Sequence, residues 1–513
     1  MGVEKTVELA RTIGLKTLVI LSLSSMLGSG IFLLPAFAHE VVGPGMWFAF
    51  ILAGSVVIAS AYSKAELASA MPQSGGFYVY AERTYGHIIG TISGLGLFAS
   101  FMLKSAFALV GFAAYMKVIT DHYGIDNVNA NAIAMVLLAF ILLVNLTGVK
   151  AIKKVQIPIV TGAMAMVVIL CIMALLSPDL DLGRPVENFQ PVSLSMGTAA
   201  ALVFVAFSGA IKVGAIGGEV MDPETNLPRG MIQSLVIATV LYAVVAYIMT
   251  AVMDPGSFMT GTPAHAVENP ISVFADSVAG TTVVLVASLV AIIAMASMAL
   301  AGVLSSSRFI YAMAKDGVLP APLGELNERY KTPHWPILLT GLLMAISIYS
   351  FDVHVIAELA SGFILMVFIV LNLTVVVLRG AGPKHEWNPP YKSPLYPLPQ
   401  IYGTVAGILM LVLMGKKALF GGAGAVLIGL IAWYAYGRKN VQPREGPTPL
   451  SAFLGRDDAE VKDELKTDCT TGLWVNSLMR GSNEGSPDFG VLRSKFARWR
   501  RTFPGRRLFP ATQ

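Results

Sequence analysis

The chain has 513 residues and a formal net charge of +5, and 55% of its residues are hydrophobic whereas only 13% are charged. The charged fraction is about 25% in an ordinary soluble domain. Together with a mean hydropathy of +0.68, this composition excludes a soluble globular protein and predicts an integral membrane protein surrounded by lipid. The small positive charge gives no reason to expect nucleic-acid binding.

Apolar segments recur along the chain at lengths that suit a bilayer, which takes about 20 residues to cross as a helix. We therefore expect an all-α integral membrane protein with about twelve transmembrane helices. The predicted spans are 15–38, 43–68, 88–118, 131–149, 155–177, 194–218, 231–253, 280–305, 335–351, 354–378, 399–416 and 419–437.

Lys and Arg residues predict the orientation, because cytoplasmic loops carry an excess of them. With residues 1–14 in the cytoplasm, sixteen basic residues precede the last span on that side and four lie outside. We expect a plasma-membrane protein with both termini cytoplasmic and a mostly disordered basic tail over 438–513, either solvated or touching anionic lipid. By this count, Lys104 and Lys212 are the basic residues inside spans.

The first span contains Gly28-Ser-Gly-Ile-Phe32 at about mid-depth. Two glycines around a serine weaken a helix, and a break inside a membrane is tolerated only beside protein or a cavity. The N–H groups at the start of the following half-helix would bind an anion such as a carboxylate. The alternative is a glycine face that packs against another helix.

The sixth span is interrupted in a similar way at Ser208–Gly209, with further glycines up to Gly218. It lies five spans after the first, and an odd number of spans per repeat makes the two halves run in opposite directions. Matched interrupted helices in two halves point to an inverted-repeat transporter with a site at the bilayer midplane.

Four ordered motifs make residues 10–440 resemble the amino acid–polyamine–organocation superfamily of permeases. The motifs are Gly28–Phe32 with Pro35, Glu66–Tyr80, Phe207–Gly209 with Glu219–Gly230, and Ser307–Gly317. The resemblance implies a five-plus-five, leucine-transporter-type core with broken helices 1 and 6, and transport of amino acids or related amines. Within a permease domain over 15–437, the repeats would cover 15–177 and 194–378, followed by added helices over 399–437.

An amino acid has two charged groups that such breaks can bind. We expect N–H groups around Ser29, Gly30 and Ile31 to bind the carboxylate, and carbonyls near Leu27–Gly28 and Phe207–Gly209 to accept from the ammonium. These backbone contacts are common to all amino acids, so they do not identify the substrate.

Phe207 is placed to cover the ligand as an aromatic gate, and a plain core or lipid-facing Phe is the alternative. The position after Ser208–Gly209 is often aromatic in the superfamily, but here it is Ala210. This departure predicts a roomier pocket, or gating by another residue.

Ion coupling is not settled by the motifs. Ser297 is the only hydroxyl in the middle of span 8, which disfavours a sodium site, and span 5 lacks the lysine that some proton-coupled relatives carry. The coupling candidates are therefore ionisable groups within spans. Lys212 is preferred because it follows Ser208 by one turn, Lys104 is the second candidate, and Glu358 is the third. The alternatives are a Lys212 that snorkels or pairs with Glu219, and a solvated Glu358.

Charged residues near the cytoplasmic helix ends are candidates for gating or for plain interfacial positions. They are Glu66, Glu219, Arg229 and Arg308, with Arg83 as a further partner for the two carboxylates.

The sequence thus predicts a secondary active amino acid transporter that takes up its substrate with protons by alternating access. An exchanger of amino acids or polyamines without ion coupling, and an amino acid-binding sensor, remain alternatives. We expect no enzyme activity, cofactor or metal site, because no metal-ligand spacing, acid–base pair or phosphate-binding loop is present.

Overall fold

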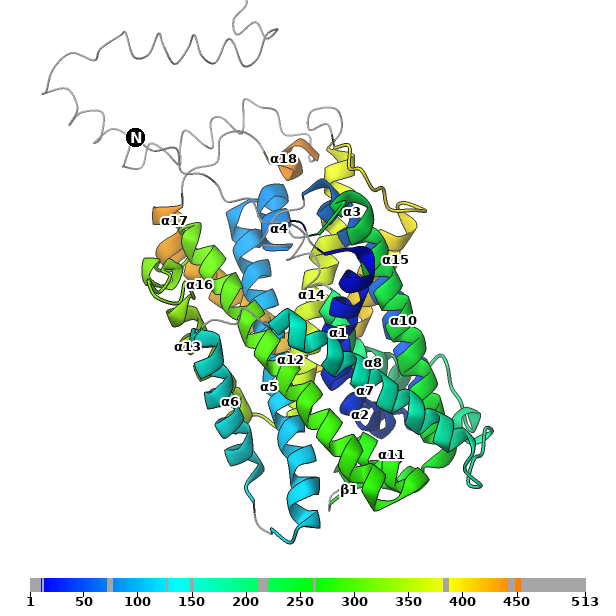
Figure 1. The fold of residues 1–513 in the computed structure, drawn as a ribbon. Coiled ribbons are helices and arrows are strands. Elements are labelled where there is room, and N and C mark those ends of the chain that lie inside the picture. Colours follow the sequence, from blue (N-terminus) through cyan, green and yellow to red (C-terminus); the bar gives the residue numbers. More distant parts are fainter. Residues whose placement is uncertain are drawn as a thin grey trace, which may run out of the picture. The chain divides into compact units, whose positions relative to one another are not determined.

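The computed structural model describes residues 11, 13–71, 77–125, 128–147, 152–210, 220–261, 264–381, 387–441 and 448–453. These residues form a bundle of helices, several of them long and steeply tilted against one another (Figure 1). The described part contains a single pair of two-residue antiparallel strands, so the protein is all-α as predicted.

The helices are α1 (Leu15–Phe32), α2 (Leu34–Val42), α3 (Met46–Ala70), α4 (Phe77–Tyr85), α5 (His87–His122), α6 (Ala130–Thr147), α7 (Ile152–Leu175), α8 (Leu194–Val203), α10 (Pro223–Val252), α11 (Pro270–Ala279), α12 (Thr281–Lys315), α13 (His334–Ser350), α14 (Val353–Gly380), α15 (Leu398–Leu413), α16 (Lys416–Ala432), α17 (Arg438–Asn440) and α18 (Pro449–Phe453). Short 3-10 turns are η1 (Gly43–Gly45), η2 (Arg184–Val186), η3 (Phe204–Ser208), η5 (Pro255–Phe258) and η6 (Ala321–Gly324), η8 (Trp433–Gly437) is a π-helical turn, and the strands are β1 (Met259–Thr260) and β2 (His265–Ala266).

Within the described residues, each of the twelve predicted spans overlaps a helix or two consecutive helical pieces. Nine helical stretches of the described residues are long and apolar enough to cross a membrane. The three remaining spans correspond to the shorter apolar stretches Leu194–Ser208, His334–Ser350 and Leu398–Leu413. Hydropathy predicted these segments because bilayer crossing depends on the length of an apolar run more than on packing details.

Besides the short α17 and α18, two helices of nine or more residues were not predicted. α4 lies in the segment that follows α3, and it buries Phe77, Tyr78 and Tyr80 while Arg83 is exposed. α11 is a ten-residue helix just before α12. Both are too short to cross a bilayer, so a search for long apolar runs passes over them.

Helices five spans apart along the chain pack against each other. α3 packs against α10, α5 against α12, and α6 against α13, while α1 contacts η3. Figure 1 shows α1 in the middle of the bundle, with the long helices α5 and α12 running past one another. Two repeats related by an axis through the bundle centre would place equivalent helices in contact in this way.

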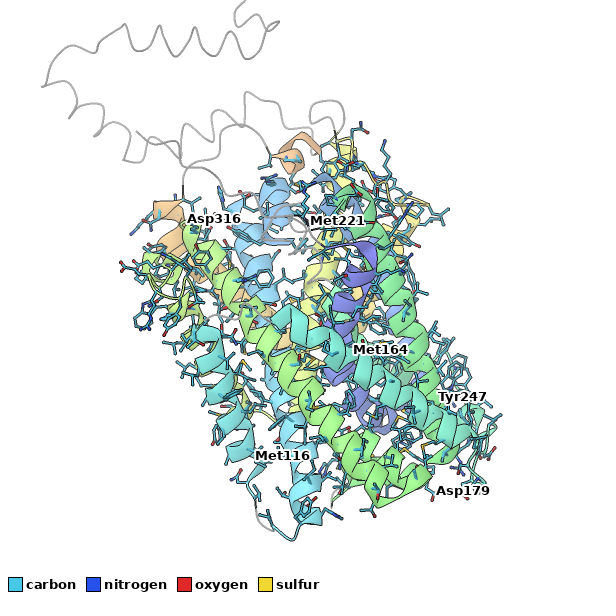
Figure 2. All side chains as sticks on the ribbon, viewed as in Figure 1. Met116, Met164, Asp179, Met221, Tyr247 and Asp316 are labelled. Carbon is cyan, nitrogen blue, oxygen red and sulfur yellow. The ribbon has the colours of Figure 1, made fainter. Side chains whose placement is uncertain are left out.

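Residues in loops and at helix ends lie at two ends of the bundle. Figure 2 shows Met221 and Asp316 toward one end, and Asp179 and Tyr247 toward the other. The sequence places the first two near basic, cytoplasmic segments and Asp179 in an outer loop. Met164, on α7, lies between the two ends.

Candidate functional site

Helix 1 is interrupted one turn later than we predicted. α1 continues through Gly28–Gly30 to Phe32, and the chain turns at Leu33, where φ is −128° and ψ is −49°. Pro35 occupies the first turn of α2. Proline has no N–H and would clash with the carbonyl of Ile31 in a continuous helix, so the interruption falls before it. In this structure the amides of Ser29, Gly30 and Ile31 are therefore part of a helix rather than of a break.

Helix 6 changes its winding at the predicted place. Ser193 caps α8 by accepting a hydrogen bond from the Met196 N–H, at 3.1 Å. After Val203 the helix tightens into η3, which ends at Ser208, directly before Gly209. A 3-10 stretch within a helix often marks a functional hinge, because its backbone hydrogen bonds have poorer geometry than those of an α-helix.

The two interrupted helices touch through glycines. A Cβ atom on Gly209 would lie 2.4 Å from the carbonyl carbon of Ser25 and 2.7 Å from the amide nitrogen of Met26, so only glycine allows this approach of two backbones. A Cβ atom on Gly30 would lie 3.1 Å from that of Ala206. The fold thus brings together the two motifs that the sequence singled out.

Side chains from two further helices close the site. A Cβ atom on Gly28 would lie 2.4 Å from Sδ of Met298 on α12, and one on Gly30 would lie 2.5 Å from the hydroxyl of Tyr242 on α10. The Ser29 amide lies 3.3 Å from the same sulfur atom of Met298. The glycine motif therefore serves as a packing face in this state. All nine predicted substrate contacts are buried, namely Leu27, Gly28, Ser29, Gly30, Ile31, Phe207, Ser208, Gly209 and Ala210.

Lys104 on α5 is almost completely buried, at 2% exposure, and it joins the two interrupted helices. Its ammonium donates to the carbonyl of Ser25 on α1, at 3.2 Å. It also donates to the carbonyls of Val205 and Ala206, at 3.0 and 3.3 Å, and to the Ser208 hydroxyl at 3.0 Å. Carbonyls of both helices thus gather around an ammonium, but they are not the carbonyls near Leu27–Gly28 and Phe207–Gly209 that we predicted, and the ammonium belongs to the protein.

Two hydroxyls beside this cluster have no hydrogen-bond partner among the described residues. They are those of Ser29 and Tyr242, which are 0% and 1% exposed. The Tyr242 ring lies 5.3 Å from that of Phe207, edge to face. Phe207 is fully buried against it, so it is a core residue in this state, and the gate role stays a prediction. Our sequence reading missed Tyr242 and Met298, which lie in apolar helices without a local motif.

Glu66 is paired, but not with the residues we expected. Its carboxylate, which is fully buried on α3, accepts from Nε and Nη2 of Arg379 on α14, at 2.8 and 2.6 Å. It also accepts from the Trp387 indole at 3.0 Å and from the Ser393 amide at 2.8 Å. Arg83, Arg229 and Arg308 are exposed instead.

Further buried polar groups continue this contact along α3. Asn372 on α14 accepts from Ser63 at 2.8 Å and donates to Ser60 at 2.9 Å, and Gln400 on α15 donates to Ser63 at 3.1 Å. Together with Glu66 and its partners, we call these residues the polar seam. It fastens α3 to α14 and α15.

Glu358 lies at the other end of α14, beside a histidine. His354 is 3.0 Å from Glu40, just beyond the turn of helix 1, and 3.9 Å from Glu358. All three side chains are between 22% and 30% exposed. The group connects α2 to α14, and it does not touch the contact between helices 1 and 6.

Two predicted residues, Lys212 and Glu219, lie outside the described residues. A third lysine belongs among the buried cations, because Lys64 on α3 is only 2% exposed. We had counted it with the cytoplasmic residues, since it lies near the end of its span.

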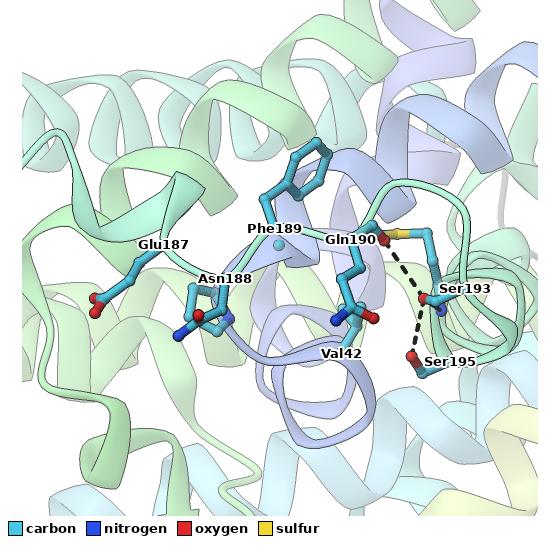
Figure 3. Close-up of a pocket in the computed structure, with 10 residues that line it drawn as sticks. Val42, Glu187, Asn188, Phe189, Gln190, Ser193 and Ser195 are labelled. Atoms are coloured by element: carbon cyan, nitrogen blue, oxygen red, sulfur yellow. Dashed lines mark hydrogen bonds between the residues drawn. The ribbon is translucent and has the colours of Figure 1, made fainter.

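An open pocket of about 320 Å³ lies beside Val42 at the end of α2 and beside Ser195 and Met196 at the start of α8, away from the contact between Gly209 and Ser25 (Figure 3). It is lined by the η1 turn and by the loop that precedes α8, including Phe189, Gln190 and Ser193. The Ser193 hydroxyl donates to the Gln190 carbonyl in this loop and shares a hydrogen bond with the hydroxyl of Ser195 in the first turn of α8. These contacts are local, so we do not assign the pocket to the candidate site.

Comparison with known proteins shows the family of the chain. A family model described as amino acid permease matches residues 13–433. The branched-chain amino acid permease BcaP of Bacillus subtilis (strain 168) is 27% identical over 453 residues, covering 84% of this chain and 94% of its own length.

Two other relatives show the breadth of the similarity. The methylthioribose transporter of the same organism is 26% identical, with 85% of this chain and 95% of its own length covered. The vacuolar cationic amino acid transporter 2 of Arabidopsis thaliana is 26% identical, with coverages of 74% and 61%. The resemblance that the motifs indicated is confirmed: the chain is a multi-pass membrane transporter and belongs to the amino acid permease family of the amino acid–polyamine–organocation superfamily.

Proposed function

We propose that the protein takes up neutral amino acids with apolar side chains across the cell membrane by alternating access, coupled to protons. The observation that carries the proposal is the cluster of Ser25, Val205 and Ala206 carbonyls, contributed by both interrupted helices and gathered around an ammonium. Such a cluster suits the ammonium of an amino acid. The family of the chain supports an amino acid as the substrate.

The side chains around the cluster favour an apolar substrate side chain. Leu27, Ile31, Phe207 and Met298 are all buried there. The positive charge of Lys104 disfavours a second cation nearby, and thus a lysine-like or arginine-like substrate. Two relatives that are named branched-chain amino acid permeases point in the same direction.

Alternating access follows from how the site is closed. Because every predicted contact residue is buried, a ligand reaches the site only when packed helices move apart. We propose that helices 1, 2, 6 and 7, which are α1 with α2, α3, α8 with η3, and α10, rock against the remaining helices around the site. The packing of α10 against both α1 and α3 supports their motion as one unit.

We also propose a topology of two inverted repeats with both termini on the cytoplasmic side. The two inverted repeats would cover 15–177 and 194–378, with helices over 399–437 added to them. Residues 1–14 and the tail from 438 would both lie in the cytoplasm. The contacts between helices five spans apart support the repeats, and the distribution of Lys and Arg supports the orientation.

Proton coupling requires a group whose charge changes during the cycle. Lys104 and Lys212 are our candidates, and Glu358 is a third one beside His354. Replacing Lys212 with Met should abolish proton-driven accumulation while preserving binding. Normal accumulation in that variant would remove Lys212 from the mechanism.

The test is uptake of radiolabelled leucine into proteoliposomes under imposed proton, sodium or potassium gradients. We expect accumulation only with an inward proton gradient. Leucine movement that needs leucine on both sides would identify an exchanger instead. The proposal fails if neither leucine nor any other amino acid is accumulated or exchanged.

A further inference from the structure

The ammonium of Lys104 occupies the place that an amino acid's own ammonium would take. Carbonyls of Ser25, Val205 and Ala206 accept from it at 3.0 to 3.3 Å, and the Ser208 hydroxyl completes the set. An ammonium has three N–H donors, so these four acceptors already exceed what one ammonium can satisfy with separate bonds. A second ammonium does not fit among the same oxygens.

We propose that Lys104 is a specificity-determining residue that selects zwitterions. In the empty carrier its ammonium holds the carbonyl cluster, and when an amino acid binds, the substrate's ammonium replaces it while Lys104 turns to the substrate's carboxylate. The inference rests on the proposed function, because it assigns the recognition of both charged groups at the same site.

The place proposed for the substrate's carboxylate, near Ser29, lies close to the side chain of Lys104. Ser25 and Ser29 are four residues apart on α1. The Ser25 carbonyl, which accepts from Lys104, therefore faces the Ser29 amide one helical turn further along. The unpartnered hydroxyls of Ser29 and Tyr242 lie beside that level and supply donors for an anion. A lysine side chain carries its charge on a flexible four-carbon stem, so a short displacement needs only rotamer changes.

The exchange requires both charged groups of the substrate. An amine without a carboxylate would bring a second cation next to Lys104 and give the displaced lysine no partner, which is costly in a buried site. A carboxylic acid without an amine leaves Lys104 on its carbonyls and adds an anion beside it. The wild-type protein should therefore bind the acid better than the amine.

The experiment measures how three ligands displace radiolabelled leucine from the purified full-length protein. The ligands are leucine, isocaproate, which lacks the amine, and isoamylamine, which lacks the carboxylate. In the wild type we expect isocaproate to compete better than isoamylamine. In Lys104→Met this order should reverse, with the ratio of the two affinities changing by about tenfold or more, as for the loss of one charge-assisted hydrogen bond.

Matched variants separate this role from the loss of a buried lysine. Lys64→Met removes another buried lysine, which lies on α3, and should keep the wild-type order of the two ligands. Lys104→Gln tests the same reversal with a side chain that retains a donor.

Unchanged order in Lys104→Met would overturn the inference, as would loss of leucine binding in both Lys104 variants at an unchanged unfolding temperature. If the wild type transports and binds no amino acid at all, the proposed function fails instead.

Discussion

Two buried polar regions of this protein differ in how completely their groups are paired. In the polar seam, both oxygens of Glu66 accept two hydrogen bonds each, and the opposite charge of Arg379 lies within 2.6 Å. At the contact of helices 1 and 6, Lys104 is held by backbone carbonyls, and the hydroxyls of Ser29 and Tyr242 have no described partner. In the seam the Glu66 carboxylate is fully paired, and Oε1 of Gln400 is the one seam atom without a partner among the described residues, whereas the second region has two unpartnered hydroxyls that could donate to a ligand.

The largest loss of stability should come from removing the ion pair of the polar seam. Arg379→Met leaves the Glu66 carboxylate buried without its counter-charge, which costs about 3–5 kcal/mol of stability for a broken buried pair. We expect a markedly lower thermal unfolding temperature in detergent, while the protein that remains folded still binds leucine. Arg308→Met removes an exposed arginine and should leave the unfolding temperature unchanged. An equal loss in both variants would mean that the seam is not what fastens α3 to α14.

The next effect should appear where the two interrupted helices touch. Gly209→Ala places a methyl group against the Ser25 and Met26 backbone, which cannot rotate away, and overpacking of this kind costs about 1–3 kcal/mol. We expect leucine affinity to fall by about tenfold or more. Gly162→Ala, on α7, has no atom within 4 Å of the new methyl group and serves as the control. Full affinity in Gly209→Ala would show that this contact is not part of the site.

A pair of tyrosines sharpens the comparison further. Tyr242→Phe removes an unpartnered hydroxyl, so stability should stay the same or rise by about 1 kcal/mol while leucine affinity falls several-fold. Tyr115→Phe removes a hydroxyl that donates to the Phe32 carbonyl at 2.6 Å and accepts from the Ile271 amide at 3.2 Å. That variant should lose about 1 kcal/mol of stability. The opposite pattern in an unfolding and binding series would contradict the assignment of Tyr242 to the site.

The smallest effect concerns a carboxylate outside both regions. Burial raises the pKa of the Glu268 carboxyl above its ordinary value of 4.5, and the charges of His265 and Lys117 offset part of that rise. A raised pKa means that the folded state binds the proton more tightly than the unfolded state, so stability falls as pH rises above about 4.5. Glu268→Gln should flatten this part of the pH profile of unfolding, and the exposed Glu187→Gln should not. A wild-type profile without the decline would contradict the predicted cost of burying Glu268.

The spans and the two interruptions could be predicted from sequence because both depend on local composition. An apolar run long enough for a bilayer is visible residue by residue, and glycine and proline mark where a helix is weak. Even so, the glycines placed the interruption of helix 1 one helical turn too early. The helix continues through them because Met298 and Tyr242 pack against them. Pro35 was the better guide to the interruption at Leu33.

Partners distant in sequence could not be predicted. The fold brings Lys104 to the Ser208 hydroxyl from 104 residues away, a contact that no local pattern indicates. Lys212, which the sequence favoured because it follows Ser208 by four residues, lies outside the described residues. Glu66 finds Arg379 at a separation of 313 residues, although three other arginines had seemed suitable. Such pairs depend on which helices pack together, and the distribution of charged residues along the chain does not reveal that packing.

The central claim about this protein is that the amino acid binds where helices 1 and 6 meet. Its most direct test is alkylation of two single-cysteine variants, Ser29→Cys and Ser193→Cys, made after both native cysteines are replaced by alanine. We expect leucine to slow the labelling of Ser29→Cys and to leave Ser193→Cys, in the open pocket of Figure 3, unchanged. Labelling of Ser29→Cys that is unaffected by leucine, with protection at Ser193→Cys, would contradict the claim.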